Sequence, residues 1–77
     1  MPTVRLQVLI EQDEDGFFVM DVPALRGCHA QGRTYEEGME NIRDVIAMCV
    51  REMREEGLEI ETGYPEVIGI KTLEIAV

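Results

Sequence analysis

The chain has 77 residues, and sixteen acidic against seven basic side chains give it a formal net charge of −9. A folded chain this short buries only about 60% of the surface that it exposes when unfolded, so we expect a single domain over residues 1–77 with little room for a deep active-site cavity. The charge disfavours direct binding of nucleic acid or of an anionic membrane, and a hydrophobic fraction of 45% is too high for a disordered chain.

The first elements predicted along the chain are two strands joined by a tight turn. Apolar and polar residues alternate over residues 3–11, as in a strand with one buried face, and the apolar positions are Val4, Leu6, Val8 and Ile10. The step Asp15-Gly16 favours a hairpin, because glycine adopts positive φ without a steric cost. Residues 17–22 then form the returning strand, with Phe18, Met20 and Val22 on one face.

A short connector and a brief third strand follow. Pro23 ends the second strand, since proline has no N–H to donate to a ladder. Residues 28–31 are long enough for a third strand, which Gly32 ends. The sequence therefore predicts an antiparallel three-stranded meander.

A long amphipathic helix is predicted next. Thr34 and Glu37 form a capping box, in which the threonine hydroxyl accepts from the Glu37 N–H. Gly57 is expected to end the helix, because glycine readily adopts the left-handed conformation found just after a helix. Gly38 in the first turn costs about 1 kcal/mol relative to alanine. The apolar positions recur at spacings of three and four and form one stripe: Tyr35, Met39, Ile42, Val45, Ile46, Cys49, Val50 and Met53.

The last part of the chain predicts a polar link over residues 59–65 and then strand over 67–70 and 73–77, where Leu73, Ile75 and Val77 alternate with other residues. The element order is thus β-β-β-α-β. The fold class is α+β, with the helix packed on one face of a small sheet.

The sequence assembles no evident reactive site. Asp13, Glu14 and Asp15 are adjacent carboxylates, but neighbouring hairpin residues point in different directions, so we interpret them as a solvated turn rather than a metal site. Cys28 and His29 are neighbours in a strand and face opposite sides of the sheet, so they cannot act together as nucleophile and base. We predict no catalytic, cofactor-binding or metal-binding residue, and a protein that is not an enzyme.

The two cysteines and the hydropathy pattern bear on location. Cys28 and Cys49 are interpreted as small, reduced, buried residues, because no export leader precedes the first strand. No apolar run approaches the roughly 18 residues of a membrane span. We expect a cytoplasmic protein without membrane contact.

The predicted sheet also has apolar residues on its second face. Leu9, Phe17 and Val19 lie opposite the main apolar set, in a chain too short to cover both faces. This pattern predicts a homo-oligomer or a protein partner.

Two stretches of the chain resemble the HicB-like antitoxin family. Residues 15–28 match the family pattern DGxxxAxxPxLxGC, and residues 32–42 match GxTxxEAxxNI. Met20 and Gly38 depart from the pattern, because each stands where the family usually has alanine or a similarly small residue. The motif positions serve the turns, the connector and the helix cap rather than catalysis: Asp15, Gly16, Pro23, Gly27, Cys28, Gly32, Thr34 and Glu37.

The resemblance implies a truncated ribonuclease-H-like fold that lacks the nuclease carboxylates. It implies an antitoxin that binds a small basic RNA-cleaving toxin of the HicA type and masks the toxin's RNA-binding surface. Many family members carry a C-terminal DNA-binding module, which we do not see in these residues, so we expect no operator binding. The exposed carboxylates of the hairpin tip and of the helix, Glu36, Glu40 and Asp44, are the candidate contacts.

Two other functions stay open. One is a stand-alone, homo-oligomeric HicB-like domain with a different regulatory or ligand-binding role. The other is a degenerate metal-dependent nuclease, which would require carboxylates that converge in space.

Overall fold

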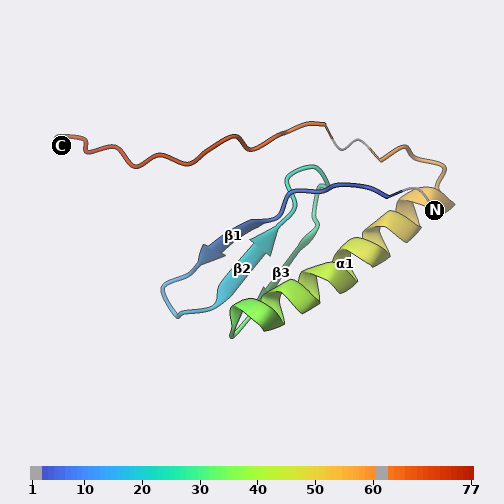
Figure 1. Cartoon of the computed structure of the whole chain (residues 1–77), viewed down its shortest axis with the longest axis horizontal. Helices are drawn as coiled ribbons and strands as arrows, with labels where there is room; N and C mark the ends of the chain where they lie inside the picture. The colour runs from blue at the N-terminus through green and yellow to red at the C-terminus, as the bar shows by residue number, and fades with distance from the viewer. Residues whose placement is uncertain (1–2, 61–62) are drawn as a thin grey trace.

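The computed structural model describes residues 3–60 and 63–77. Three strands, β1 (Leu9–Gln12), β2 (Phe18–Asp21) and β3 (His29–Gly32), precede one helix, α1 (Tyr35–Glu55). The strands form an antiparallel sheet in the order β1-β2-β3, and α1 lies across one face of it (Figure 1). The predicted three-stranded meander with one long helix is confirmed.

The turn between β1 and β2 depends on Asp13 as well as on the predicted glycine. The Asp13 carboxylate accepts hydrogen bonds from the backbone N–H groups of Asp15, at 3.0 Å, and Phe17, at 2.9 Å. Gly16 has φ of +89°, which glycine adopts without strain. The first of the three adjacent carboxylates therefore has a structural partner in the turn.

β1 is shorter than predicted, although its alternation is correct. Leu9 pairs with Asp21, so residues before Leu9 would have to pair beyond the end of β2. There the chain turns away at Pro23, and the Leu25 N–H donates back to the Val22 carbonyl. Leu6 and Val8 nevertheless pack against the core, as the alternation predicted.

The core lies between the sheet, the β2–β3 connector and α1. The connector places Leu25 and Cys28 inside, and the Val22 N–H donates to the Cys28 carbonyl at 3.0 Å. β3 begins at His29 and includes Gly32, one residue later than predicted. The buried apolar residues are Met20, Val22, Leu25, Cys28 and Ile42.

Two glycines set how closely β3 and α1 approach each other. A Cβ atom on Gly32 would lie 2.8 Å from the carbonyl carbon of Glu37, which is helix backbone. A Cβ atom on Gly38 would lie 2.5 Å from the terminal methyl of Met20. The helix start therefore packs directly on the end of β3, and this contact accounts for a glycine in the first turn of α1.

Both ends of α1 follow the sequence prediction. The Thr34 hydroxyl accepts a hydrogen bond from the Glu37 N–H at 3.0 Å. At the other end Gly57 has φ of +73°, and its N–H donates to the Arg54 carbonyl. The Leu58 N–H donates to the Met53 carbonyl at 2.8 Å, which completes a Schellman motif.

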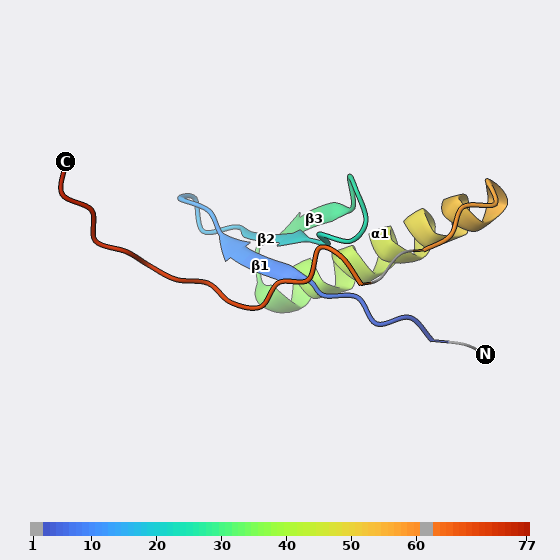
Figure 2. The same cartoon turned by 90° about the horizontal axis from the view of Figure 1, so that it is seen from above.

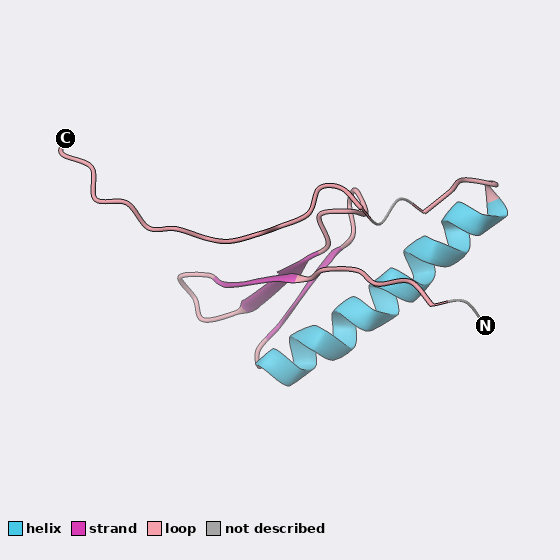
Figure 3. Ribbon diagram, turned by 45° about the horizontal axis from the view of Figure 1, so that its top comes forward, coloured by secondary structure: helices cyan, strands magenta, loops and turns pink. Residues whose placement is uncertain are grey.

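Residues 63–77, which we call the C-terminal arm, differ from the prediction. The described arm contains no strand, so the strands predicted over 67–70 and 73–77 are absent there; residues 61–62 of the predicted link lie outside the described part. The arm runs past β1 and away from the sheet (Figures 1 and 2), and Figure 3 draws all of its described length as loop. The alternation of apolar and polar residues indicates that the arm could form a strand. In the structure, however, the arm pairs with none of the three strands of the sheet.

Candidate partner-binding surface

The three helix residues proposed from the sequence lie on one exposed stripe of α1. Glu36, Glu40 and Asp44 are spaced by four residues, which places them above one another on a helix. Glu36 and Glu40 line a shallow depression of about 480 Å³ beside Arg43. Asp44 is not among the residues that line it. We call Glu36, Glu40 and Asp44 the helix stripe.

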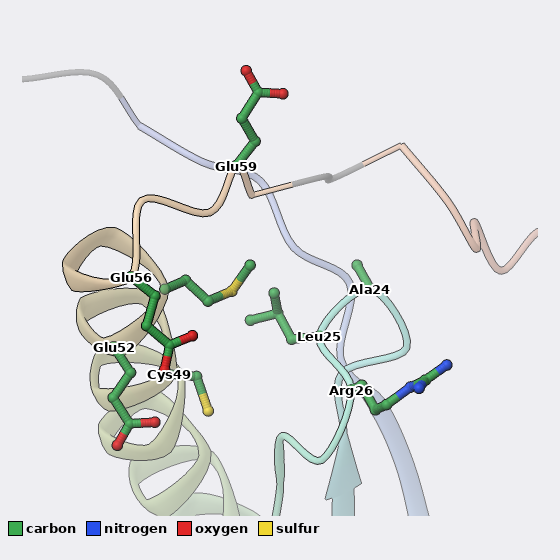
Figure 4. A pocket seen from close by; sticks show the side chains of 8 residues that line it. Ala24, Leu25, Arg26, Cys49, Glu52, Glu56 and Glu59 are labelled. Carbon is green, nitrogen blue, oxygen red and sulfur yellow. The ribbon is translucent and has the colours of Figure 1, made fainter.

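A second acidic feature lies at the other end of α1 and was missed by sequence analysis. It is a groove of about 410 Å³ between the β2–β3 connector and the C-terminal half of the helix (Figure 4). We call it the acidic groove. Its lining residues are Ala24, Leu25, Arg26, Cys49, Glu52, Met53, Glu56 and Glu59.

The acidic groove combines an apolar floor with a charged rim. Leu25 is buried and Met53 is half-buried, whereas Glu52 and Glu56 are exposed. Figure 4 shows Glu52 in the last part of α1 and Glu56 just past its end, with Arg26 on the connector opposite. A lysine or arginine side chain has the matching chemistry, since its alkyl stem packs on apolar surface while its head binds carboxylates.

The spacing of Glu52 and Glu56 was visible in the sequence, because residues four apart share a helix face. What the sequence did not show is that the connector would fold over that face. The connector is placed there by Leu25, which is 4% exposed and packs in the core.

The cysteine pair lies beneath the acidic groove. Both thiols are free, with Cys28 buried and Cys49 half-buried at the groove wall. Burial, together with a hydrogen bond to Cys49 and the nearby charge of Asp21, raises the pKa of the Cys28 thiol to about 12. A thiol held in its neutral form is a poor nucleophile, which agrees with a packing role.

The remaining motif residues have structural positions. Asp15 and Gly16 form the hairpin tip, where they border a small depression beside Arg33. Pro23 and Gly27 shape the connector, and Gly27 has φ of +76°. Cys28, Gly32, Thr34 and Glu37 serve the core, the close approach of helix and sheet, and the helix cap as described above.

The structure was also searched for a metal-binding cluster and for a membrane-spanning helix. Among residues 3–60 and 63–77, no three His, Cys, Asp or Glu side chains gather as a metal ion would require. In the same described ranges, α1 is not apolar enough along its length to cross a bilayer.

The second face of the sheet is only partly apolar. Leu9 pairs with Asp21, and Val19 lies between Glu11 and Gln31. Leu9, Phe17 and Val19 are half-buried rather than fully exposed. This face therefore offers a smaller apolar surface than the alternation had indicated.

Comparison with known proteins gives a consistent result. Residues 6–72 match the model of a HicB-like antitoxin of bacterial toxin–antitoxin systems. A UPF0150 protein of Synechocystis sp. is 44% identical over 61 residues, which cover 79% of this chain and 88% of that protein. A UPF0150 protein of Archaeoglobus fulgidus is 33% identical over 94% of this chain and 96% of its own length. No solved structure matches the chain significantly.

Proposed function

We propose that this chain, which belongs to the HicB-like antitoxin family, neutralises a small basic RNA-cleaving toxin of the HicA type by covering the toxin's RNA-binding surface. The observation that carries this proposal is the concentration of exposed carboxylates along α1, in the helix stripe and the acidic groove. A surface that binds RNA phosphates is positively charged, so an acidic protein surface competes for the same side chains.

Electrostatics supports fast and selective capture of such a partner. The formal charge of −9 attracts a basic protein before contact and repels nucleic acid. Steering of this kind raises association rate constants from about 10⁵–10⁶ to 10⁸–10⁹ M⁻¹s⁻¹ at low salt. An antitoxin gains from this rate, because the toxin acts on RNA until it is bound.

The size of the chain suits masking rather than catalysis. A specific interface takes about 800 Å² from each partner, and the whole accessible surface here is 6712 Å². An interface of this kind would use roughly an eighth of the surface, which α1 and the adjoining connector can supply. In this proposal the acidic groove receives a lysine or arginine side chain of the toxin, and the helix stripe binds further basic groups.

The remaining expectations belong to the same proposal. The chain acts in the cytoplasm, without a cofactor and without enzymatic activity, and its fold derives from a truncated ribonuclease-H-like unit. A direct check is RNA hydrolysis by the purified chain with magnesium. Turnover that is lost in Asp15→Ala would favour the nuclease alternative and contradict the proposal.

The test of the main proposal uses a short basic reading frame next to this chain's gene. Expressed alone, its product should arrest growth, and co-expression of this chain should restore growth. Glu52→Gln with Glu56→Gln should weaken binding of the purified product by about tenfold or more at low salt, since each removes a charge-assisted contact. Glu36→Gln with Glu40→Gln tests the helix stripe in the same way.

The matched control is Glu66→Gln with Glu74→Gln, which changes the net charge equally but lies on the C-terminal arm. We expect this variant to bind within about threefold of the parent, because only general steering is reduced. If all three variants bind equally well at both low and high salt, masking through α1 is contradicted.

One observation favours a second candidate function. The C-terminal arm exposes large apolar side chains that a toxin-masking surface on α1 does not use. A stand-alone, homo-oligomeric HicB-like domain with another regulatory or ligand-binding role would use them. A gene neighbourhood without any short basic reading frame would favour this second function.

A further inference from the structure

The two cysteines meet where the β2–β3 connector packs on α1. Cys28 at the end of the connector is fully buried, whereas Cys49 on α1 is half-buried and lines the acidic groove. Their side chains form a hydrogen bond, so the two sulfur atoms are in contact. Both thiols are free, and neither takes part in the proposed binding of basic side chains.

We propose that Cys49 and Cys28 form a thiol–disulfide site, at which a small cationic disulfide enters the acidic groove, reacts with Cys49 and is then displaced by Cys28. The product is an internal disulfide that ties the connector to α1. This inference concerns a reaction of the chain's own thiols and is independent of the proposed toxin binding.

Backbone hydrogen bonds hold the pair in place. The Cys28 N–H donates to the Leu25 carbonyl at 3.1 Å, and the Cys28 carbonyl accepts from the Val22 N–H at 3.0 Å. Cys49 lies in the interior of the helix Tyr35–Glu55. Cysteines whose side chains point apart cannot be bridged without backbone movement, but hydrogen-bonded thiols already point towards each other. The fold therefore prepares the bond without requiring the connector or the helix to move far.

Access decides the order of the two steps. Figure 4 shows the Cys49 side chain between α1 and the connector, where the groove admits a small molecule, whereas Cys28 is fully buried. Burial also raises the pKa of Cys28 to about 12, so this thiol is neutral near pH 7 and reacts second. Its contact with Cys49 offsets that disadvantage, because groups held together react with effective molarities of about 10⁵ M or more.

The reaction is a double thiol–disulfide exchange. Cys49, as the thiolate, attacks one sulfur of the small disulfide, whose S–S bond breaks, and one small thiolate leaves and takes up a proton. Cys28 then loses its proton to water and attacks the sulfur of Cys49, and the second small thiolate leaves and is protonated. Two protein thiols are thereby oxidised to one disulfide, and the small disulfide is reduced to two thiols.

The charge of the acidic groove selects among small disulfides. Its rim carries three carboxylates, Glu52, Glu56 and Glu59, against one guanidinium, Arg26. A disulfide with ammonium groups, such as cystamine, is attracted to this rim, whereas oxidised glutathione carries a negative net charge and is repelled. The groove therefore favours cationic over anionic disulfides.

The bond would hold the two walls of the acidic groove at one separation. One wall is α1, which carries Cys49, and the other is the connector, which carries Cys28. In a reducing environment small thiols keep such a pair open, so the bond forms only when small disulfides accumulate. The pair thus makes the shape of the groove sensitive to oxidation.

The first test follows the mass of the folded full chain during incubation with cystamine. The parent should lose two hydrogen atoms and both free thiols, at a rate that does not depend on protein concentration. Cys28→Ala should stop with one cysteamine attached to Cys49. Cys49→Ser is the matched variant, and its buried Cys28 should react at least about 100-fold more slowly than the parent. Circular dichroism should show equal helix content in all three proteins.

The second test compares cystamine with oxidised glutathione, each relative to its reaction with an unstructured cysteine peptide. At low salt cystamine should be preferred by about tenfold or more, and high salt should reduce this preference. Glu52→Gln with Glu56→Gln should lower the preference at least about threefold. Glu66→Gln with Glu74→Gln is the matched control on the C-terminal arm and should leave it within about twofold.

The parent alone decides the inference if a cysteine variant does not fold. Peptide mapping of its time course should find the first adduct on Cys49 and then the Cys28–Cys49 bond. Thiols that stay free, disulfide-linked dimers, a lasting adduct on Cys49, a first adduct on Cys28, or equal preference for the two probes at low salt would each overturn the inference. None of these results depends on whether a toxin binds, so failure here leaves the proposed function standing.

Discussion

The sheet–helix body, residues 3–60, and the C-terminal arm carry similar apolar alternation and have opposite environments. Met20 and Val22 of the body are 0% and 1% exposed, because α1 covers that face of the sheet. Ile68 and Ile70 of the arm are 94% and 82% exposed, because neither the sheet nor α1 covers them. The alternation of apolar and polar residues thus determines which face of a segment is apolar. Whether that face is buried depends on a second element that packs against it.

The largest expected effect that tests this comparison is at Gly32. A Cβ atom there would overlap the backbone at the start of α1, and backbone cannot move aside as a side chain can. Gly32→Ala should therefore lower the free energy of unfolding by about 4 kcal/mol or more, measured by urea denaturation.

Gly69→Ala is the matched control in the arm, where a new Cβ atom meets nothing within 4 Å. We expect its unfolding free energy to stay within about 0.5 kcal/mol of the parent. An equal loss of unfolding free energy in the two variants would show that the arm is packed as tightly as the body.

The second prediction compares two isoleucines. Ile42 on α1 is fully buried, so Ile42→Ala should cost about 3 kcal/mol of unfolding free energy at every protein concentration. Ile75→Ala should change the unfolding free energy by less than about 0.5 kcal/mol, because Ile75 is 71% exposed. A loss for Ile75→Ala as large as that for Ile42→Ala would show that the arm packs on the sheet–helix body.

The third prediction concerns the two positions that depart from the family pattern. Met20 and Gly38 contact each other, so a large side chain on β2 is matched by the absence of one on α1. Met20→Ala should cost about 2–3 kcal/mol through the cavity that it leaves, and Gly38→Ala about 1 kcal/mol through crowding.

The double variant restores the residue pair usual in the family and should be more stable than the sum of the single changes predicts. We expect a favourable coupling of about 2 kcal/mol in a double-mutant cycle of urea unfolding. Additive losses would show that the two departures are unrelated.

The smallest expected effect is at the helix start. Thr34→Ala removes the acceptor for the Glu37 N–H and should cost about 1 kcal/mol in thermal or urea unfolding. Thr34→Ser retains the hydroxyl and should remain within a few tenths of a kcal/mol of the parent. A Thr34→Ala variant as stable as Thr34→Ser would contradict the role of the cap.

The candidate site shows where sequence reasoning reached its limit. Glu36, Glu40 and Asp44 were found because spacing alone places them on one helix face. The acidic groove was missed because half of it belongs to the connector, whose Arg26 and Leu25 lie more than twenty positions before Cys49 and Glu52 in the sequence. Helical periodicity describes one element at a time, and a groove between two elements requires their relative position.

The amino-acid sequence by itself determined the local structure: the hairpin at Gly16, the connector at Pro23, the helix between Thr34 and Gly57, and the family. These features depend on interactions between residues a few positions apart, so they can be recognised from the order of residues along the chain. Only the tertiary structure decided that Gly32 lets β3 and α1 touch, that the connector closes the acidic groove, and that the C-terminal arm leaves the sheet. Such outcomes depend on contacts between distant segments, and periodicity fixes only the faces that those segments present.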